Sequence, residues 1–297
     1  MFLILDQKLD KFSLRLREIA EHKGLETVFI TSAELVHNVL LVFHIAEQGC
    51  NLYLRYRDKV IRSSDIEGVY CGIDIFEPAL WKYFAPKDAE YAARETQALW
   101  LAILTSLPCR VVNPPAFESL AGTLLSTPEI FYLAHQMGFD IPMMINLESG
   151  KIAAEVLRKG VPAYYADLGE MWINETKLSH NNIPFLEQNE NHFQVVEEIP
   201  GKLIHISLVG NQFFACEIAT NGLVSPIDVS KIPHLIKARL RTLHKRLNLK
   251  LAEYFFRIMV DGTWVFVGYI RKPLYAITAY GDALFEKIID YIVKRRK

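Results

Sequence analysis

The sequence lacks any marked excess of charge. Lysine and arginine number 33 and aspartate and glutamate 34 among 297 residues, which gives a formal net charge of −1. A chain so close to neutral has no overall field that would attract nucleic acid or an acidic membrane surface. No apolar run approaches the roughly 18 residues that a membrane span needs, and no segment has the pattern of a signal peptide. We therefore expect a cytoplasmic protein that binds neither membranes nor nucleic acid.

Cysteine is also scarce, and the few cysteines are far apart. Cys50, Cys71, Cys109 and Cys216 form no CxxC pair and lie among apolar neighbours, which is typical of buried, reduced thiols. The histidines show no HxxxH or HExxH spacing, so we expect no metal site. Motifs of the forms GxSxG, GxGxxG and GxxxxGKS/T are missing. The chain therefore lacks the signatures of α/β-hydrolases, dinucleotide-binding folds and phosphate-binding loops.

Apolar residues make up 51% of the chain, which is ample material for folded cores. Over residues 1–112, apolar strands at 1–5 and 27–31 alternate with helical patterns at 10–24, 32–43 and 86–107. We expect Ser32 to cap the second helix and a hairpin to turn at Arg57–Asp58. The buried face of the third helix is expected to contain Tyr91, Ala92, Leu99, Ile103 and Leu107. Strands that alternate with helices predict a mainly parallel sheet, and thus an α/β fold.

The pattern changes after residue 112. Residues 113–200 contain a helix that ends at Gly138, a short helix near 150–160, a strand-like segment with a turn at Gly169, and a polar loop at 178–192. Residues 201–297 read as α+β, with a Gly210–Asn211 turn, an amphipathic helix at 231–249 and a final amphipathic helix. A hairpin turns on Asp261–Gly262, a strong hairpin signal. We therefore predict three domains, at 1–112, 113–200 and 201–297.

Four motifs, in order along the chain, resemble those of the ATP-grasp superfamily. They are "VVNPP" (111–115) with a following helix and "GFDIP", "VVEEIPGKLIHISLVGNQFFACEI" (195–218), "LNLKLAEYFF" (247–256) and "DGTWVFVGYIRKP" (261–273). The resemblance is closest to the ribosomal-protein glutamate ligases and to the ATP-grasp enzymes that modify ribosomally made peptides, as in microviridin biosynthesis. It implies an ATP-grasp fold over nearly the whole chain, with an N-terminal pre-ATP-grasp domain built on a parallel sheet.

Members of this family use ATP to convert a carboxylate into an acylphosphate, which an amine then attacks. The resemblance implies Mg²⁺ held by an aspartate on one strand of the C-terminal hairpin and by a glutamate and an asparagine on the other. It also implies two lysines in the central domain that contact the phosphates as point charges.

The lysine positions depart from that pattern. Alignment of the motifs places Thr127 at the first lysine and either Tyr164 or Tyr165 at the second. His205 takes the place of an arginine. Glu197, in the hinge segment that holds the adenine in the family, is kept. The segment "STPEIF" thus matches a phosphate-binding segment that has no charge.

The metal-binding positions depart as well. Phe255 takes the place of the aspartate, and Gly268 and Ile270 take those of the glutamate and the asparagine. The acid nearest to these positions is Glu253, on the same strand face as Phe255. We interpret this as loss of the metal ligands, with an apolar groove formed by Tyr164, Tyr165, Phe255 and Tyr269. A triphosphate in such a groove would be very unfavourable without compensating cations.

These departures predict a degenerate ATP-grasp protein that needs no cofactor. It would act as a peptide-binding or partner subunit in a peptide-modification pathway, as a homodimer or as a heterodimer with an intact ATP-grasp paralogue. One alternative is an active carboxylate–amine ligase that uses MgATP, with Glu197 and Glu253 as unusual metal ligands. Another alternative is a small-molecule sensor that uses the former nucleotide cleft.

The helix at 231–249 carries cations opposite an apolar face. The apolar face is expected to contain Ile232, Leu235, Ile236, Leu240, Leu243 and Leu247, with His244 on the cationic side. A solvated helix face is the ordinary interpretation of such a pattern. The functional alternative is a partner-binding face for an acidic peptide, formed by Lys237, Arg241 and Lys245. No aromatic residues alternate with these cations, so RNA is not an expected ligand.

Overall fold

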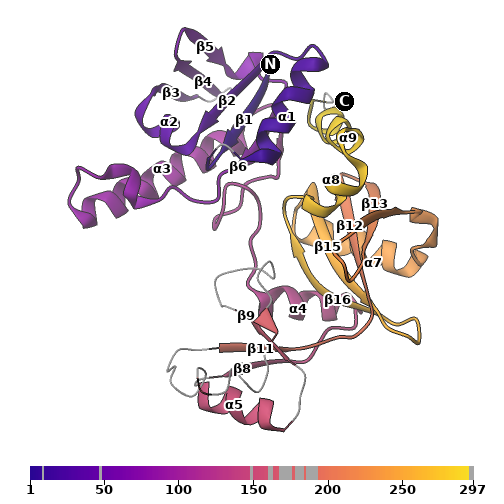
Figure 1. Ribbon diagram of the computed structural model, residues 1–297. Helices are drawn as coiled ribbons and strands as arrows, with labels where there is room; N and C mark the ends of the chain where they lie inside the picture. Colours follow the sequence, from indigo (N-terminus) through magenta and orange to yellow (C-terminus); the bar gives the residue numbers. More distant parts are fainter. Residues whose placement is uncertain are drawn as a thin grey trace.

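Figure 1 shows the computed structural model of the chain. The structure describes residues 1–8, 10–46, 49–147, 150–159, 163–166, 176, 177, 184 and 193–293. The described residues form four β-sheets, of four, three, four and five strands, together with the helices that pack on them. Short 3₁₀ helices lie at Ser63–Asp65, Pro78–Trp81 and Val229–Lys231.

The N-terminal sheet is parallel, as predicted. It contains β1 (Phe2–Asp6), β2 (Thr27–Thr31), β6 (Gly68–Gly72) and β7 (Arg110–Val112), in the order β2-β1-β6-β7. Strand β1 lies inside the sheet and is buried along its whole length, as expected of a parallel strand covered on both faces. Helix α1 (Lys11–His22) begins at Asp10, whose carboxylate accepts a hydrogen bond from the Ser13 N–H.

A three-stranded antiparallel sheet follows β2, where the sequence predicted a longer helix. Helix α2 covers only Ser32–His37, and β3 begins at Val39. The helix cap is Thr31 and not Ser32, because Thr31 and Glu34 form a reciprocal capping box. Strand β3 (Val39–Ala46) pairs with β4 (Gly49–Tyr56), and β4 pairs with β5 (Lys59–Arg62) around the predicted Arg57–Asp58 turn. Pairing of the apolar, β-branched segment with β4 therefore overrides its helical pattern.

Helix α3 covers Pro86–Ser106, within one residue of the prediction, and Ile103 and Leu107 are buried as predicted. Tyr91 and Leu99 are exposed, whereas Ala93 and Trp100 are buried. The buried face of α3 thus runs through Ala93, Trp100, Ile103 and Leu104, which pack into the N-terminal core.

The central part of the chain contains a small antiparallel sheet. It consists of β8 (Met144–Leu147), β9 (Ala163–Ala166), β10 (Thr176–Lys177) and β11 (Phe193–Glu197), in the order β10-β9-β11-β8. Helices α4 (Thr127–Gln136) and α5 (Gly150–Arg158) accompany it, and Gly138 follows α4 with a φ of 82°. The predicted Gly169 turn and the 178–192 loop, apart from residue 184, lie outside the described residues.

The C-terminal sheet carries the positions where the resemblance implies metal ligands, Phe255, Gly268 and Ile270. It consists of β12 (Lys202–Val209), β13 (Gln212–Ile218), β14 (Val224–Ile227), β15 (Leu251–Ile258) and β16 (Trp264–Ile270), in the order β14-β13-β12-β15-β16. Both predicted hairpins are present: β12 pairs with β13 and β15 with β16. Helices α7 (His234–Arg246) and α4 pack on one face, and α8 (Leu274–Tyr280) lies on the other.

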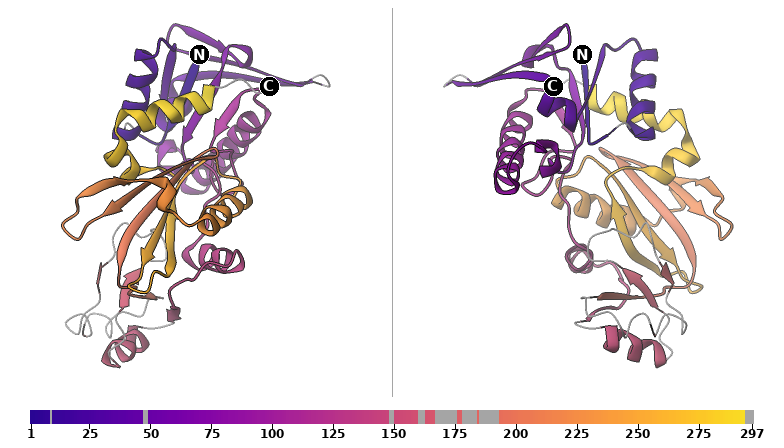
Figure 2. Two further views of the ribbon diagram at one scale, coloured as in Figure 1. Left: turned by 90° about the vertical axis from the view of Figure 1, so that its right-hand side faces the viewer. Right: turned by 60° about the vertical axis from the view of Figure 1, so that its left-hand side comes forward.

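The last helix packs the C-terminal part of the chain against the N-terminal sheet. Helix α9 (Asp282–Val293) packs against α1, β6 and β7, and Figures 1 and 2 show it lying beside the N-terminal sheet. Ile288, Ile289 and Ile292 share a buried cluster with Phe2 and Ile4. The division into three domains stays a prediction, and α9 contributes directly to the core around β1.

Three of the cysteines, Cys71, Cys109 and Cys216, are buried, as predicted, and Cys50 is partly buried. Burial raises the pKa of Cys71 to about 12, so this thiol stays protonated near neutral pH. None of the described helices is long and apolar enough to cross a membrane.

Candidate functional site

The two faces of the C-terminal sheet have different surroundings. Along β15, Tyr254 and Phe256 point into the core formed with α4 and α7. Glu253 and Phe255 therefore point to the opposite side, where Glu253 meets α8. We call this second side the α8 face. It is defined by His205, Ser207, Glu253, Phe255, Gly268 and Ile270.

Strand register brings four of the predicted site residues together on the α8 face. His205 of β12 lies opposite Phe255 of β15, and Phe255 lies opposite Gly268 of β16. Ile270 lies opposite Glu253. The rings of His205 and Phe255 have centroids 4.3 Å apart. The positions aligned in the two motifs therefore lie side by side on one face of the sheet.

Glu253 is completely buried, and its carboxylate is held by the start of α8. The N–H of Tyr275 donates to Oε2 at 3.0 Å, and the N–H of Ala276 donates to Oε1 at 2.9 Å. These groups are among the first N–H groups of α8, which have no partner within the helix. Glu253 therefore caps α8 from a neighbouring strand, and both of its oxygens are occupied.

Tyr275 closes the α8 face over His205. Its ring lies edge-on to the His205 imidazole, with centroids 4.3 Å apart, and edge-on to Phe255 at 6.3 Å. His205 Nδ1 lies 3.6 Å from Glu253 Oε1, beyond hydrogen-bond distance, and has no hydrogen-bond partner among the described residues. The sequence did not indicate a role for Tyr275, because it follows the last recognised motif.

The donor atoms on the α8 face do not fit Mg²⁺. This ion needs several oxygen ligands in nearly octahedral geometry. Phe255, Val265, Val267 and Ile270 instead form a buried apolar cluster, packed against Ile199, Leu203 and Met259. Within the described residues, no group of three or more His, Cys, Asp or Glu residues could hold a metal ion.

Other predicted site residues lie elsewhere. Tyr269 is on the opposite face from Phe255, where it is fully buried and its hydroxyl accepts a hydrogen bond from Leu125 N–H at 3.0 Å. The prediction that it lines a groove with Phe255 is therefore wrong. Thr127 is buried at the start of α4, whose apolar side chains pack with Tyr269. Adjacent residues of a strand alternate between faces, and this separates Tyr269 from Ile270 and Gly268.

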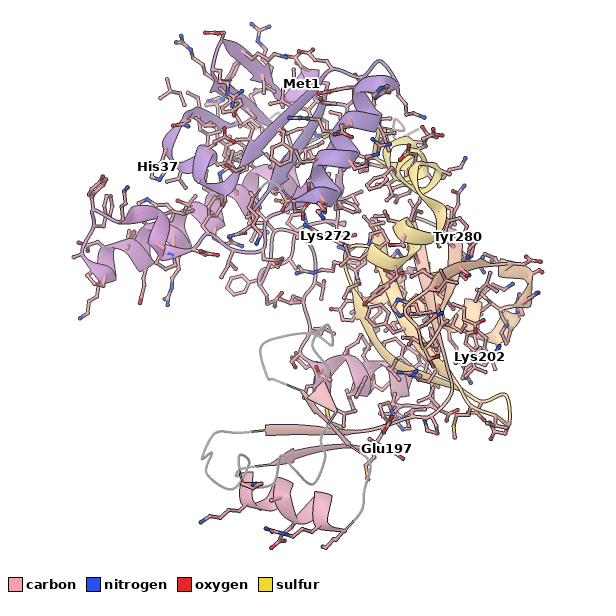
Figure 3. All side chains as sticks on the ribbon, viewed as in Figure 1. Met1, His37, Glu197, Lys202, Lys272 and Tyr280 are labelled. Carbon is pink, nitrogen blue, oxygen red and sulfur yellow. The ribbon has the colours of Figure 1, made fainter. Side chains whose placement is uncertain are left out.

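Three further predicted residues, Tyr164, Tyr165 and Glu197, belong to the central sheet. Tyr164 and Tyr165 lie in β9 and pair in register with Val196 and Val195 of β11. The side chains of Tyr164 and Tyr165 lie outside the described part, so their place in an aromatic groove stays a prediction. Glu197 ends β11 and exchanges hydrogen bonds with Met143: its carboxylate accepts from the Met143 N–H at 3.0 Å. Figure 3 shows Glu197 where β11 turns toward the C-terminal sheet.

The link between β16 and α8 contributes two cations that the alignment did not assign. Arg271 forms an ion pair with Asp74 at 2.6 Å and donates to Ser119 Oγ at 2.6 Å. Lys272 bridges Asp6, the last residue of β1, and Asp10, which caps α1. Figure 3 shows Lys272 between the N-terminal and C-terminal sheets. A pocket of about 190 Å³ lies here.

The positive charge of Lys272 is compensated by carboxylates of the protein itself. Burial raises the pKa of Asp6, although Lys272 and Ser13 favour its ionised form. Burial alone would also raise the pKa of Asp10, but hydrogen bonds from Lys272 and from the Ser13 N–H lower it overall. Carboxylates from the N-terminal segment thus neutralise Lys272. We infer that Lys272 links the C-terminal part of the chain to the end of β1 and the start of α1. It is therefore not free to bind a phosphate.

Replacement of Lys272 by methionine should destabilise the protein by about 2–3 kcal/mol at pH 7. This is slightly below the range for breaking a buried ion pair, because the Lys272 side chain is 28% exposed. Without the cation, the pKa of Asp6 rises further above its unfolded value, so the deficit should shrink as the pH falls toward 4.5. Urea unfolding at several pH values measures both effects.

Lys59→Met is the matched control for this experiment. Lys59 pairs with Glu26 at 2.8 Å on the exposed surface, and loss of such a pair costs at most about 0.5 kcal/mol. Equal losses for the two variants would contradict the role assigned to Lys272.

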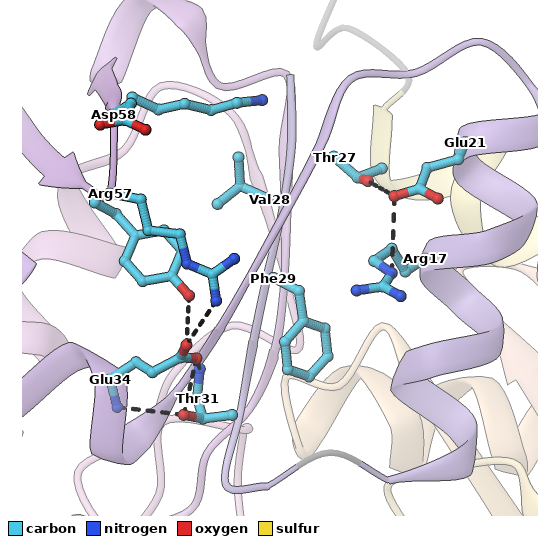
Figure 4. A pocket seen from close by; sticks show the side chains of 11 residues that line it. Arg17, Glu21, Thr27, Val28, Phe29, Thr31, Glu34, Arg57 and Asp58 are labelled. Atoms are coloured by element: carbon cyan, nitrogen blue, oxygen red, sulfur yellow. Dashed lines mark hydrogen bonds and ion pairs between the residues drawn. The ribbon is translucent and has the colours of Figure 1, made fainter. Parts of the chain in front are cut away.

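A larger pocket of about 600 Å³ lies along β2 and is bordered by α1 and the β4–β5 turn. Four of its charged groups form ion pairs within it, Arg17 with Glu21 and Arg57 with Glu34 (Figure 4). Glu34 accepts hydrogen bonds from the Tyr56 hydroxyl and from Arg57, and Glu21 accepts one from the Thr27 hydroxyl. These hydrogen bonds and ion pairs link the side chains that line the pocket to one another, which indicates a structural role for them.

The basic face of α7 is narrower than the sequence predicted. Arg241 and Lys245 are exposed, whereas Lys237 is partly buried and donates to the Val229 carbonyl. His244 does not belong to this face: it is buried, with Nδ1 2.8 Å from the Tyr254 hydroxyl. Burial lowers the pKa of His244 to about 4, so it is neutral. Leu235, predicted to be buried, is exposed.

Comparisons with known proteins agree with this arrangement at the level of the fold. The macrocyclase MdnC from Microcystis aeruginosa MRC, bound with precursor peptide MdnA, superposes with a TM-score of 0.76 at 15% identity, over 99% of this chain and 100% of that chain. The chain has the ATP-grasp fold. It includes the N-terminal pre-ATP-grasp sheet that the motifs implied.

Two other ATP-grasp structures match similarly. A Chryseobacterium gregarium RiPP-associated ATP-grasp ligase, in complex with ADP and a leader and core peptide, has a TM-score of 0.73 at 13% identity, over 100% of this chain and 97% of that chain. The ATP-grasp ligase PsnB, with minimal precursor, Mg and ADP, has a TM-score of 0.72 at 15% identity, over 99% and 98%. No protein-family model and no curated protein matches the sequence.

Proposed function

We propose that this chain is a binding or partner subunit with the ATP-grasp fold that does not itself carry out ligation. One observation carries the proposal. The positions where the resemblance implies oxygen ligands for Mg²⁺ hold Phe255, Gly268 and Ile270, and Phe255 and Ile270 belong to a buried apolar cluster. Such a surface offers neither the oxygens that Mg²⁺ needs nor charge compensation for a triphosphate.

The proposed partner is a ribosomally made peptide, or an intact ATP-grasp enzyme that modifies such a peptide. Solved structures with this fold include complexes with precursor peptides, which supports a polypeptide partner. A protein that no longer performs ligation must act through binding. We therefore propose a homodimer, or a heterodimer with an intact paralogue, that buries at least about 1,000 Å² in total.

The alternative is an active carboxylate–amine ligase with unusual metal ligands. Solved structures of this fold that contain Mg and ADP favour it. Glu253 and Glu197 are the acids that it would use. Both carboxylates already accept backbone hydrogen bonds, from the start of α8 and from Met143. These contacts favour a structural role for both residues and make this the second choice.

Millimolar MgATP should leave the melting temperature of the protein unchanged. The α8 face supplies no carboxylate free for Mg²⁺ among the described residues, and Thr127 supplies no charge for a phosphate. Thermal-shift measurements and calorimetric titration test this expectation, with an intact ATP-grasp ligase as the positive control. A dissociation constant below about 100 µM would stabilise the fold by more than about 1 kcal/mol at that concentration. Such a shift would overturn the proposal.

A further inference from the structure

The antiparallel sheet of β3, β4 and β5 leaves an apolar face uncovered. Along β4 its side chains alternate between buried and exposed. Leu52, Leu54 and Ile61 are buried in the N-terminal core, whereas the residues between them point outward. The outward side chains include Leu40 (69% exposed), Val42 (61%), Tyr53 (47%) and Val60 (57%).

These four side chains form one continuous patch. Register pairs place Val42 opposite Tyr53, and Arg55 opposite both Leu40 and Val60. Directly opposite residues on neighbouring strands have Cβ atoms about 5 Å apart. Arg55 therefore lies at the centre of the patch. The solvated face of an antiparallel sheet is usually polar, so this composition is unusual.

The charges on this outer face have one sign. Arg55 and Arg62 are both exposed on it, next to the apolar side chains. His44 and Asn51 also point outward, and none of the outward residues described on these strands is acidic. A second copy of the same face would bring arginines against arginines. A partner with carboxylates around an apolar stripe would satisfy both the apolar surface and its charge.

The width of the patch favours a helix over an added strand. Three strands span about 10 Å from β3 to β5, since neighbours lie about 4.8 Å apart, and this matches the diameter of a helix. A strand added at the free edge of β3 would contact Leu40 and Val42 but would leave Tyr53, Val60 and both arginines uncovered. A helix lying across the sheet covers all of them.

We propose that the outer face of β3–β5 docks an acidic amphipathic helix of a partner polypeptide. The apolar stripe of that helix packs on Val42 and Tyr53, and its flanking carboxylates pair with Arg55 and Arg62. This surface involves none of the α8-face residues, so it is independent of whether the chain retains ligase activity.

The experiment uses the full chain and two synthetic helical peptides of 18 residues. Both carry leucine at i, i+3, i+4 and i+7 spacing, with either glutamate or lysine beside the stripe. Fluorescence anisotropy should show the glutamate peptide binding at least tenfold more tightly. Amide hydrogen exchange should show new protection at 39–62. Tyr53→Ser should weaken binding at least tenfold, whereas Leu223→Ser, at another exposed apolar site, should not change it.

Charge reversal provides the decisive comparison. Arg55→Glu combined with Arg62→Glu should invert the preference between the two peptides. Absence of binding at 1 mM, or equal affinities for both peptides, would overturn the proposal. Binding to phosphatidylglycerol vesicles that Arg55→Glu abolishes would assign the face to a membrane instead. Self-association that Tyr53→Ser abolishes would assign it to a second copy. Either result would also overturn the proposal.

Discussion

A variant that restores the family's ligands should be less stable than the parent protein and should still fail to bind Mg²⁺–nucleotide. It combines Thr127→Lys, Phe255→Asp, Gly268→Glu and Ile270→Asn. Phe255 and Ile270 are 7% and 5% exposed, in a cluster of apolar side chains. Carboxylates placed there without a metal cost several kcal/mol between them, and the apolar contacts of both side chains are lost as well. We expect a loss of at least about 4 kcal/mol.

The backbone adds to this loss at Gly268. Its φ of 150° is a conformation that L side chains rarely adopt. Tyr275 also lies over His205 and Phe255, so the space that a metal would need is occupied. Restoring the ligands by substitution therefore does not restore the cavity.

Urea unfolding and calorimetric titration with Mg²⁺ and ATP measure the two outcomes. Leu223→Asp is the control for introducing a carboxylate at an exposed apolar position, and it should change stability by less than about 0.5 kcal/mol. Because the combined variant can fail to fold, the pair Phe255→Asn and Ile270→Asn provides a milder test with uncharged oxygen donors. A folded variant of either kind that binds nucleotide only with Mg²⁺ would show that ligands alone were lost.

Replacement of Glu253 by alanine should destabilise the protein by about 3 kcal/mol. The change leaves the N–H groups of Tyr275 and Ala276 without their acceptor in a buried place, at about 1–3 kcal/mol for each group. It also leaves a cavity where the side chain was. Relief of the desolvated carboxylate offsets part of this cost. Chemical denaturation measures the loss.

Glu253→Gln separates a structural role from a catalytic one. Glutamine keeps one amide oxygen that can accept from α8, so this variant should lose about half as much stability as Glu253→Ala. If Glu253 instead held a metal in an active ligase, Glu253→Gln would abolish ligation while the protein stayed folded. Ligase activity in the parent protein that disappears in this variant would replace our proposal with the alternative.

Several features of the fold could be predicted from the sequence because they depend on local pattern. The parallel N-terminal sheet followed from strands that alternate with helices. The hairpin at Asp261–Gly262 followed from its turn residues, and Gly262 does adopt a positive φ of 86°. The motif order also identified which strands carry His205, Phe255 and Ile270, and these residues do lie together on one face.

Local pattern was misleading where tertiary contacts compete with it. The segment after Ser32 has apolar residues at helical spacing, but pairing with β4 makes a strand of its second half. His244 resembles a member of a cationic face, but packing against Tyr254 buries it. Tyr269 was assigned to a groove with Phe255, yet the two point to opposite sides of the sheet. Alternation along β16 separates them, because Tyr269 pairs with Tyr254 whereas Gly268 pairs with Phe255.

The sequence by itself determined the family resemblance and the replacement of family ligands by apolar residues, because each depends on residue identity and short-range spacing. The tertiary structure alone decided what occupies the place of those ligands. Glu253 meets α8 from 22 residues away, and Lys272 meets Asp6 across 266 residues. Contacts at such separations depend on how sheets and helices pack, and residue spacing along the chain carries no signal for them.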